Sequence, residues 1–126
     1  MGLSYTTLQL RNPRLPQIQA MQVPSLADTG SMYLCIPFDV ARRLQLEELD
    51  KREIVTAENK RILCSYVGPI EVSFANRSCF TGAIVLGNEV LLGAIPMEDM
   101  DLVVLPLQRM VAVNPLSPNI ASGIVK

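Results

Sequence analysis

The chain has 126 residues, of which 49% are hydrophobic and 18% are charged, and its formal net charge at pH 7 is −1. This length suits a single domain with a core of its own. Nucleic acid is bound by basic surfaces and stacking aromatic side chains, so the near-neutral charge and the 5% aromatic content predict no nucleic-acid partner.

The sequence contains no histidine. Ser-His-Asp and Cys-His catalysis both require an imidazole, as do the commonest zinc-enzyme sites, so carboxylates remain as the main acid–base groups. We expect no metal site and no cofactor. The cysteines, Cys35, Cys64 and Cys79, have no Cys-x-x-Cys spacing and predict reduced core thiols in a cytoplasmic protein. The longest apolar run, residues 102–107, is far shorter than the roughly 20 residues of a membrane span, so no membrane partner is expected.

Alternating apolar residues and turn signals predict many short strands. In chain order, we expect strands at 3–10, 17–27, 33–36, 54–57, 61–67, 69–74, 78–86, 90–92, 102–105 and 109–113. We also expect a short helix from 37 to 44, a charged connector at 46–52, and a helical turn that begins at Pro96 with Glu98 and Asp99 near its positive end. These elements predict an all-β domain over residues 1–113, a small barrel with one or two short helices. Residues 114–126 form a tail that we expect to be either disordered or packed on a neighbouring subunit.

One motif, Asp28-Thr29-Gly30-Ser31, lies in a tight turn between two apolar stretches, residues 23–27 and 32–37. An ionised carboxylate in an apolar setting is costly unless it is hydrogen-bonded or shares its proton with a partner. Gly30 permits backbone conformations that a side chain would block. Two aspartates that share one proton are the catalytic groups of aspartic proteases. Because the chain has one Asp-Thr-Gly, the second aspartate would come from another copy of the chain.

The order of these features resembles the retropepsin-like (clan AA) aspartic proteases, in particular the single-domain members of bacterial type. The resemblance runs from about residue 3 to about residue 113. It includes the Asp28 motif between apolar strands, a hairpin at the place of the flap, and Val90-Leu91-Leu92-Gly93-Ala94. This last segment is similar to the apolar-apolar-Gly segment that threads behind the catalytic loop in that fold. The resemblance implies a small closed acid-protease barrel.

The resemblance also implies a homodimer that hydrolyses peptide bonds of a peptide or protein substrate. The Asp28 carboxylates of both subunits would form a dyad that activates a water molecule. Thr29 would bond across the subunit interface, and Gly30 would leave room for the substrate backbone. The Ser31 hydroxyl would donate to the outer oxygen of Asp28 and favour its ionised form, which predicts an acidic pH optimum. The residues implied to support the dyad are Ser31, Leu92, Gly93 and Ala94.

By the same resemblance, the hairpin at residues 55–66 is the flap that closes over the substrate. Its tip consists of Thr56, Ala57, Glu58, Asn59 and Lys60. Retroviral flap tips are rich in glycine, whereas this tip has none, and Asn59 would supply the left-handed residue that the turn needs. A further departure is Ile95, at a position where family members often carry Asp or Asn.

Two alternatives stay open at this point. The first is a dimeric binding or scaffold module of the same fold that cleaves nothing, because a fold does not by itself determine a function. The second is an unrelated small β-barrel in which Asp28 only caps a turn. A dimer with Asp28-dependent cleavage would distinguish the protease from both.

Overall fold

The structure is a computed structural model and describes residues 3–125. Strands and two short helices make up the ordered elements. They are β1 (Ser4–Arg11), β2 (Met21–Ala27), β3 (Leu34–Ile36), α1 (Phe38–Arg43), β4 (Glu47–Val55), β5 (Arg61–Phe74), β6 (Arg77–Val85), β7 (Val90–Leu92), α2 (Ala94–Asp99), β8 (Leu102–Leu105) and β9 (Met110–Val113). The predicted all-β class with one or two short helices is confirmed.

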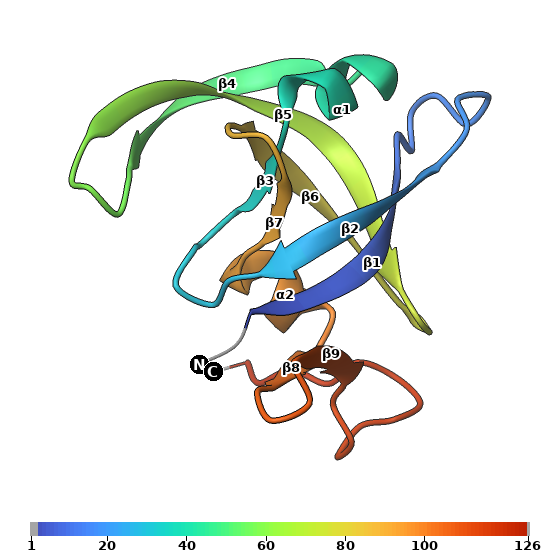
Figure 1. Ribbon diagram of the computed structural model, residues 1–126. Coiled ribbons are helices and arrows are strands. Elements are labelled where there is room, and N and C mark those ends of the chain that lie inside the picture. The colour runs from blue at the N-terminus through green and yellow to red at the C-terminus, as the bar shows by residue number, and fades with distance from the viewer. Residues whose placement is uncertain (1–2, 126) are drawn as a thin grey trace.

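Most of the strands form one sheet that closes on itself (Figure 1). Its order is β1-β2-β7-β3-β6-β5-β4, and β1 also pairs with β5, so that every one of these strands except β4 belongs to a closed barrel. The closing pairs are antiparallel and include Leu10 opposite Val72. β8 and β9 form a separate hairpin beside α2, at the end of the barrel where the described chain begins and ends (Figure 1).

The core lies inside this barrel and continues toward α2 and the β8–β9 hairpin. Leu8 and Leu10 of β1 are completely buried, whereas Gln9 between them is not, as expected from the alternation of side chains along a strand. Met100 and Val111 belong to the same cluster of buried residues, so the second hairpin is part of the same hydrophobic core. The cysteines Cys35, Cys64 and Cys79 are all buried free thiols, as predicted.

The predicted connector at 46–52 is wrong, because these residues belong to the strand β4. Almost every residue of β4 is exposed, since the strand lies outside the barrel and pairs only with β5. A strand with no buried face has no apolar alternation, which is the signal that sequence analysis relies on. The predicted strands 61–67 and 69–74 are likewise one continuous strand, β5, because Gly68 and Pro69 make an irregularity in its pairing with β6 and not a turn.

Other element boundaries also differ from the prediction. β2 begins at Met21, so the first part of the predicted strand 17–27 is not extended. The second helix, α2, begins at Ala94 and not at Pro96. Glu98 and Asp99 therefore lie at its carboxyl end, where the helix dipole is negative, and the prediction that they lie near its positive end is wrong.

The first part of the tail is held against the domain by polar contacts. The Asp101 carboxylate accepts hydrogen bonds from Asn114 Nδ2 (3.0 Å), from the Ser117 hydroxyl and from the Ser122 backbone N–H (3.0 Å). The buried Arg77 side chain also donates to the carbonyl of Ser117. These bonds fasten the tail to its own domain as far as Ser122. Within residues 3–125, no helix has the length and hydropathy needed to cross a membrane.

Candidate active site

Asp28 stands at the end of β2, where the chain leaves the barrel and turns toward β3. β2 and β7 are parallel, with Ala27 opposite Leu92. The backbone N–H of Asp28 continues this pairing by donating to the carbonyl of Leu92 at 2.9 Å. The position of Asp28 is therefore fixed by the sheet and not by its own side chain.

The loop that follows, which we call the Asp28 loop (residues 28–33), is closed by its own hydrogen bonds. Gly30 N–H donates to Asp28 Oδ1 at 3.0 Å, and Ser31 N–H donates to the Asp28 carbonyl at 3.1 Å. An aspartate that accepts from the backbone two residues ahead is a common turn-forming arrangement. A Cβ at Gly30 would lie 3.3 Å from Asp28 Oδ1, so a side chain there would crowd the carboxylate.

The segment Leu92-Gly93-Ala94 lies directly against the Asp28 loop. Ala94 N–H donates to the Ser31 carbonyl at 2.8 Å, and Ile95 N–H donates to the Met32 carbonyl at 2.9 Å. A Cβ at Gly93 would lie 2.2 Å from the Tyr33 carbonyl oxygen, which no real contact allows. Only glycine permits this approach, and the two segments that the sequence analysis linked do lie together.

The carboxylate of Asp28 is open to solvent in a single chain. Asp28, Thr29 and Gly30 are all exposed, although the sequence argument assumed an apolar setting for the acid. No other Asp or Glu lines the cavity in front of Asp28 within the described residues. One chain therefore supplies a single carboxylate at this place.

A cavity of about 400 Å³ separates the Asp28 loop from the β4–β5 hairpin. Thr56 and Ala57, of the predicted flap tip, line this cavity, whereas the exposed Glu58, Asn59 and Lys60 do not. Its remaining lining residues are Asp28, Gly30, Ser31, Cys35, Ile54, Val55, Leu86 and Leu91. Sequence analysis did not assign Cys35, Ile54, Leu86 or Leu91 to the site. Ile54 directly precedes the predicted flap and Leu91 lies within the 90–94 segment, which was the available signal for these two, whereas Cys35 and Leu86 adjoin no predicted site segment.

The tip of the hairpin forms a turn without glycine. Thr56 N–H donates to the Lys60 carbonyl at 2.8 Å, and Lys60 N–H donates to Thr56 Oγ1 at 3.2 Å. Asn59 has a φ of 63°, in the left-handed region, as the sequence predicted for this residue. The turn is thus complete with asparagine in place of glycine.

Ser31 differs from its expected contact. The structure contains no side-chain hydrogen bond between the Ser31 hydroxyl and the Asp28 carboxylate among the described residues. Ser31 is instead close enough to the buried thiol of Cys35 to influence its pKa. Burial raises the pKa of Cys35, a hydrogen bond with Ser31 lowers it by less, and the nearby charges of Cys64 and Asp28 raise it further.

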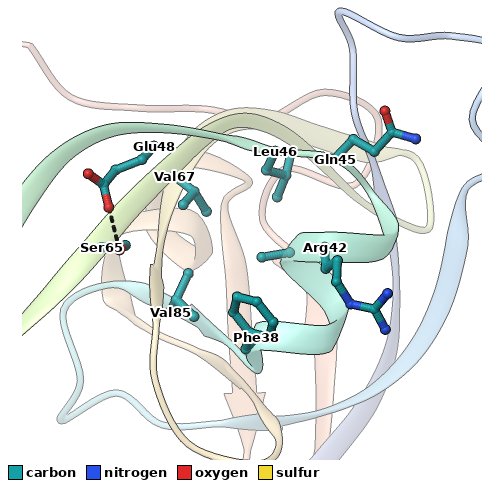
Figure 2. A pocket seen from close by; sticks show the side chains of 9 residues that line it. Phe38, Arg42, Gln45, Leu46, Glu48, Ser65, Val67 and Val85 are labelled. Atoms are coloured by element: carbon teal, nitrogen blue, oxygen red, sulfur yellow. Dashed lines mark hydrogen bonds between the residues drawn. The ribbon is translucent and has the colours of Figure 1, made fainter.

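Two other cavities help to place the site. One of about 290 Å³ also borders Asp28 and Thr29, and its other walls are Leu3, Ser4, Ala27, Val104 and Pro106. The other, of about 420 Å³, lies between α1 and strands β4, β5 and β6, and Figure 2 shows Arg42 and Gln45 pointing away from its apolar walls. Its one carboxylate, Glu48, already accepts from Ser65 and Lys51. The cavities at Asp28 are therefore the better candidates for chemistry.

No protein-family model matches this sequence, and no curated protein matches it either. The fold, however, is found among solved structures. The EIAV protease complexed with the inhibitor HBY-793 is 16% identical, with a TM-score of 0.60 over 78% of this chain and 88% of that chain. The retroviral protease-like domain of Ddi1 from Leishmania major is 10% identical, with a TM-score of 0.55 over 90% of this chain and 91% of that chain. At these identities the likeness concerns the fold alone, and the fold of this chain is retropepsin-like.

Proposed function

We propose that the protein is an aspartic endopeptidase that acts as a homodimer. The observation that carries this proposal is the position of Asp28, on a loop fixed by backbone hydrogen bonds, facing a hairpin across a cavity of about 400 Å³. The fold shared with the EIAV protease supports the same activity. Asp28 is the catalytic residue of the proposal, with Thr29 and Gly30 beside it in the same turn.

The dimer follows from what a single chain lacks. An aspartic protease needs two carboxylates in contact, and the described part of this chain brings one to the cavity. Asp28 and Thr29 also border a cavity whose walls include Leu3, which is 61% exposed. Ile124 and Val125 near the end of the chain are at least 90% exposed. Exposed apolar side chains, such as Leu3 beside Asp28 and these two near the end of the chain, are typical of a surface that a second subunit covers.

In the proposed reaction the two Asp28 carboxylates share one proton, because two carboxylates in contact cannot both ionise. The ionised carboxylate takes a proton from a water molecule, whose oxygen attacks the peptide carbonyl carbon. The protonated carboxylate gives its proton to the carbonyl oxygen, which produces a gem-diol. The carboxylate that took the proton from water then gives it to the amide nitrogen, while the other carboxylate takes a proton from a gem-diol hydroxyl and the C–N bond breaks. The products are a carboxylic acid and an amine, the dyad again holds one proton, and no covalent enzyme intermediate forms.

The hairpin would shield this reaction from bulk water. Val55, Thr56 and Ala57 line the cavity opposite Asp28, so a peptide bound there would lie between them and the Asp28 loop. Exclusion of water strengthens the electrostatic interactions on which the dyad depends. We propose that Thr56 and Ala57 contact the substrate, and that Glu58, Asn59 and Lys60 shape the turn that carries them.

The test is cleavage of denatured casein or a mixed peptide library between about pH 3 and pH 7, with and without pepstatin, by the wild type and by Asp28→Asn. Because Asn cannot share or transfer the proton, we expect the variant to lose cleavage while keeping its fold and its oligomeric state. Specific activity should rise with protein concentration, because only the dimer has two carboxylates. A folded, dimeric wild type that cleaves nothing would contradict the proposal and favour a non-catalytic binding or scaffold module.

A further inference from the structure

The β4–β5 hairpin leaves the barrel as a two-stranded ribbon (Figure 1). β5 pairs with β6 from Tyr66 onward, where Tyr66 lies opposite Ile84. Residues 61–65 of β5 pair only with β4, and β4 pairs with no other strand. Besides the packing of Cys64 and Ile54 on the buried Cys35 and Ile84, residues 53–65 are attached to the barrel through the root of the ribbon, which is formed by Arg52 and Tyr66.

A single guanidinium group joins this root to the segment that carries Asp28. Arg52 Cζ lies 4.1 Å from the centre of the Tyr66 ring, within the range of a cation–π contact. Its Nη1 donates to the Tyr33 hydroxyl at 3.1 Å, and its Nε donates to Asp50 Oδ2 at 3.3 Å. The two tyrosine rings meet edge to face, with centres 6.1 Å apart. We call Tyr33, Arg52 and Tyr66 the ribbon clasp.

Both tyrosines of the ribbon clasp are themselves fixed by close backbone contacts. Tyr66 packs on Gly82, where a Cβ would lie 2.1 Å from Tyr66 Cζ. The carbonyl of Tyr33 lies against Gly93, which also contacts the Asp28 loop at Ser31. Arg52 thus connects the projecting ribbon to Tyr33, the last residue of the Asp28 loop, whose backbone lies against Gly93.

We infer that Arg52 is a positioning residue that holds the β4–β5 hairpin over Asp28. The effect of this positioning on catalysis rests on the proposed function. The cavity between the loop and the hairpin is lined by Ile54 and Val55, which follow Arg52 on β4, and by Thr56, which directly follows the strand. A planar guanidinium can stack on one ring and donate to another group at the same time, whereas an ammonium cannot do both in this geometry. Arginine is therefore the residue that this junction requires.

The test compares Arg52→Ala and Arg52→Lys with the control Lys51→Ala. Lys51 precedes Arg52 on β4 and pairs with Glu48 at 3.0 Å, so the control removes an ion pair of the same strand but none of the ribbon clasp. Backbone ¹⁵N relaxation and relaxation dispersion of residues 54–60 would report the motion of the ribbon on ns and μs–ms timescales. We expect both Arg52 variants to increase this motion and the control to leave it unchanged.

The catalytic measurement is the change that each Arg52 substitution causes in KM and in kcat for peptide cleavage. We expect Arg52→Ala to raise KM by about tenfold and to change kcat by less than about threefold, because the loss falls on closure of the hairpin and not on the dyad. Unchanged ribbon motion in Arg52→Ala, with the barrel signals intact, would overturn the inference. Increased motion in a protein whose wild type cleaves nothing would support the ribbon clasp and refute the proposed function.

Discussion

The Asp28 loop and the β4–β5 hairpin face each other across one cavity, but they are held in different ways. The loop is joined to the β7–α2 junction by backbone hydrogen bonds from Asp28, Ala94 and Ile95. Beyond its root, the hairpin forms backbone pairs only between its own two strands, β4 and β5. At the root, the Arg52 side chain reaches across to Tyr33. We therefore expect the tip of the hairpin, which has few contacts to the core, to move more easily than the Asp28 loop, because such segments open at low free-energy cost.

The largest expected effect is on the loop side. Gly93→Ala places a Cβ 2.2 Å from the Tyr33 carbonyl oxygen and 2.8 Å from the Ser31 carbonyl oxygen, so the backbone itself has to shift. We expect a loss of about 3 kcal/mol in the free energy of unfolding, measured by urea denaturation. Gly123→Ala is the control, because a Cβ at Gly123 has no atom within 4 Å. Equal stability of the two variants would show that the loop is not locked at Gly93.

A smaller effect is expected at the root of the hairpin. In Gly82→Ala the new Cβ meets the side chain of Tyr66, 2.1 Å from Cζ, and a side chain moves more easily than backbone. We expect a loss of about 1–2 kcal/mol in the free energy of unfolding. In a Tyr66→Leu background the same change should cost less, because the clashing ring is absent. Additive effects in this double-mutant cycle would contradict the packing of Tyr66 on Gly82.

The tail resembles the hairpin, because it too is held against the domain by side chains. Hydrogen bonds from Ser117, Asn114 and Ser122 lower the pKa of Asp101 from 3.8 to about 2. Because the pKa of Asp101 is lower in the folded than in the unfolded state, the ionised carboxylate stabilises the folded protein above about pH 4. This stabilisation is lost as the pH falls from about 4 to about 2. Asp101→Asn keeps a residue that tolerates the observed φ of 55° but removes this titration. We expect the urea midpoint of the variant to fall less steeply with decreasing pH than that of the wild type. The same pH dependence in both proteins would contradict the lowered pKa of Asp101.

The smallest effect is expected for a glycine substitution at the tip of the hairpin. Asn59 is exposed and has a φ of 63°, a conformation that glycine adopts without strain. Asn59→Gly should therefore change the free energy of unfolding by less than about 0.5 kcal/mol and leave KM unchanged. Asn59→Val, which resists a positive φ, should lower the free energy of unfolding by about 1–2 kcal/mol, measured for both variants by urea denaturation. If both substitutions were neutral, the turn geometry at Asn59 would be unimportant.

The sequence predicted the loop side of the molecule better than the hairpin side. Asp28 and Gly93 could be found because their motifs require particular residue types at particular backbone positions, and the structure places the two segments in contact. The first part of β4, predicted as a connector, was missed because its exposed charges leave no apolar alternation to read, whereas the end of the strand at Ile54 and Val55 was predicted. The contacts of Arg52 with Tyr33 and Tyr66 were beyond prediction, because three residues far apart in the chain meet only after the barrel has closed.

Closure of the barrel also dictates the order in which the chain can complete its structure. β1, the first strand, pairs with β5 at Ser73, and β2 finds its parallel partner only in β7. The support of the Asp28 loop needs the backbone of Ala94 and Ile95. During synthesis, Asp28 therefore emerges long before anything can hold it in place, and loop closure over such sequence distances slows folding. We therefore expect a nascent or truncated chain that stops before residue 94 to carry the Asp-Thr-Gly motif without an ordered Asp28 loop.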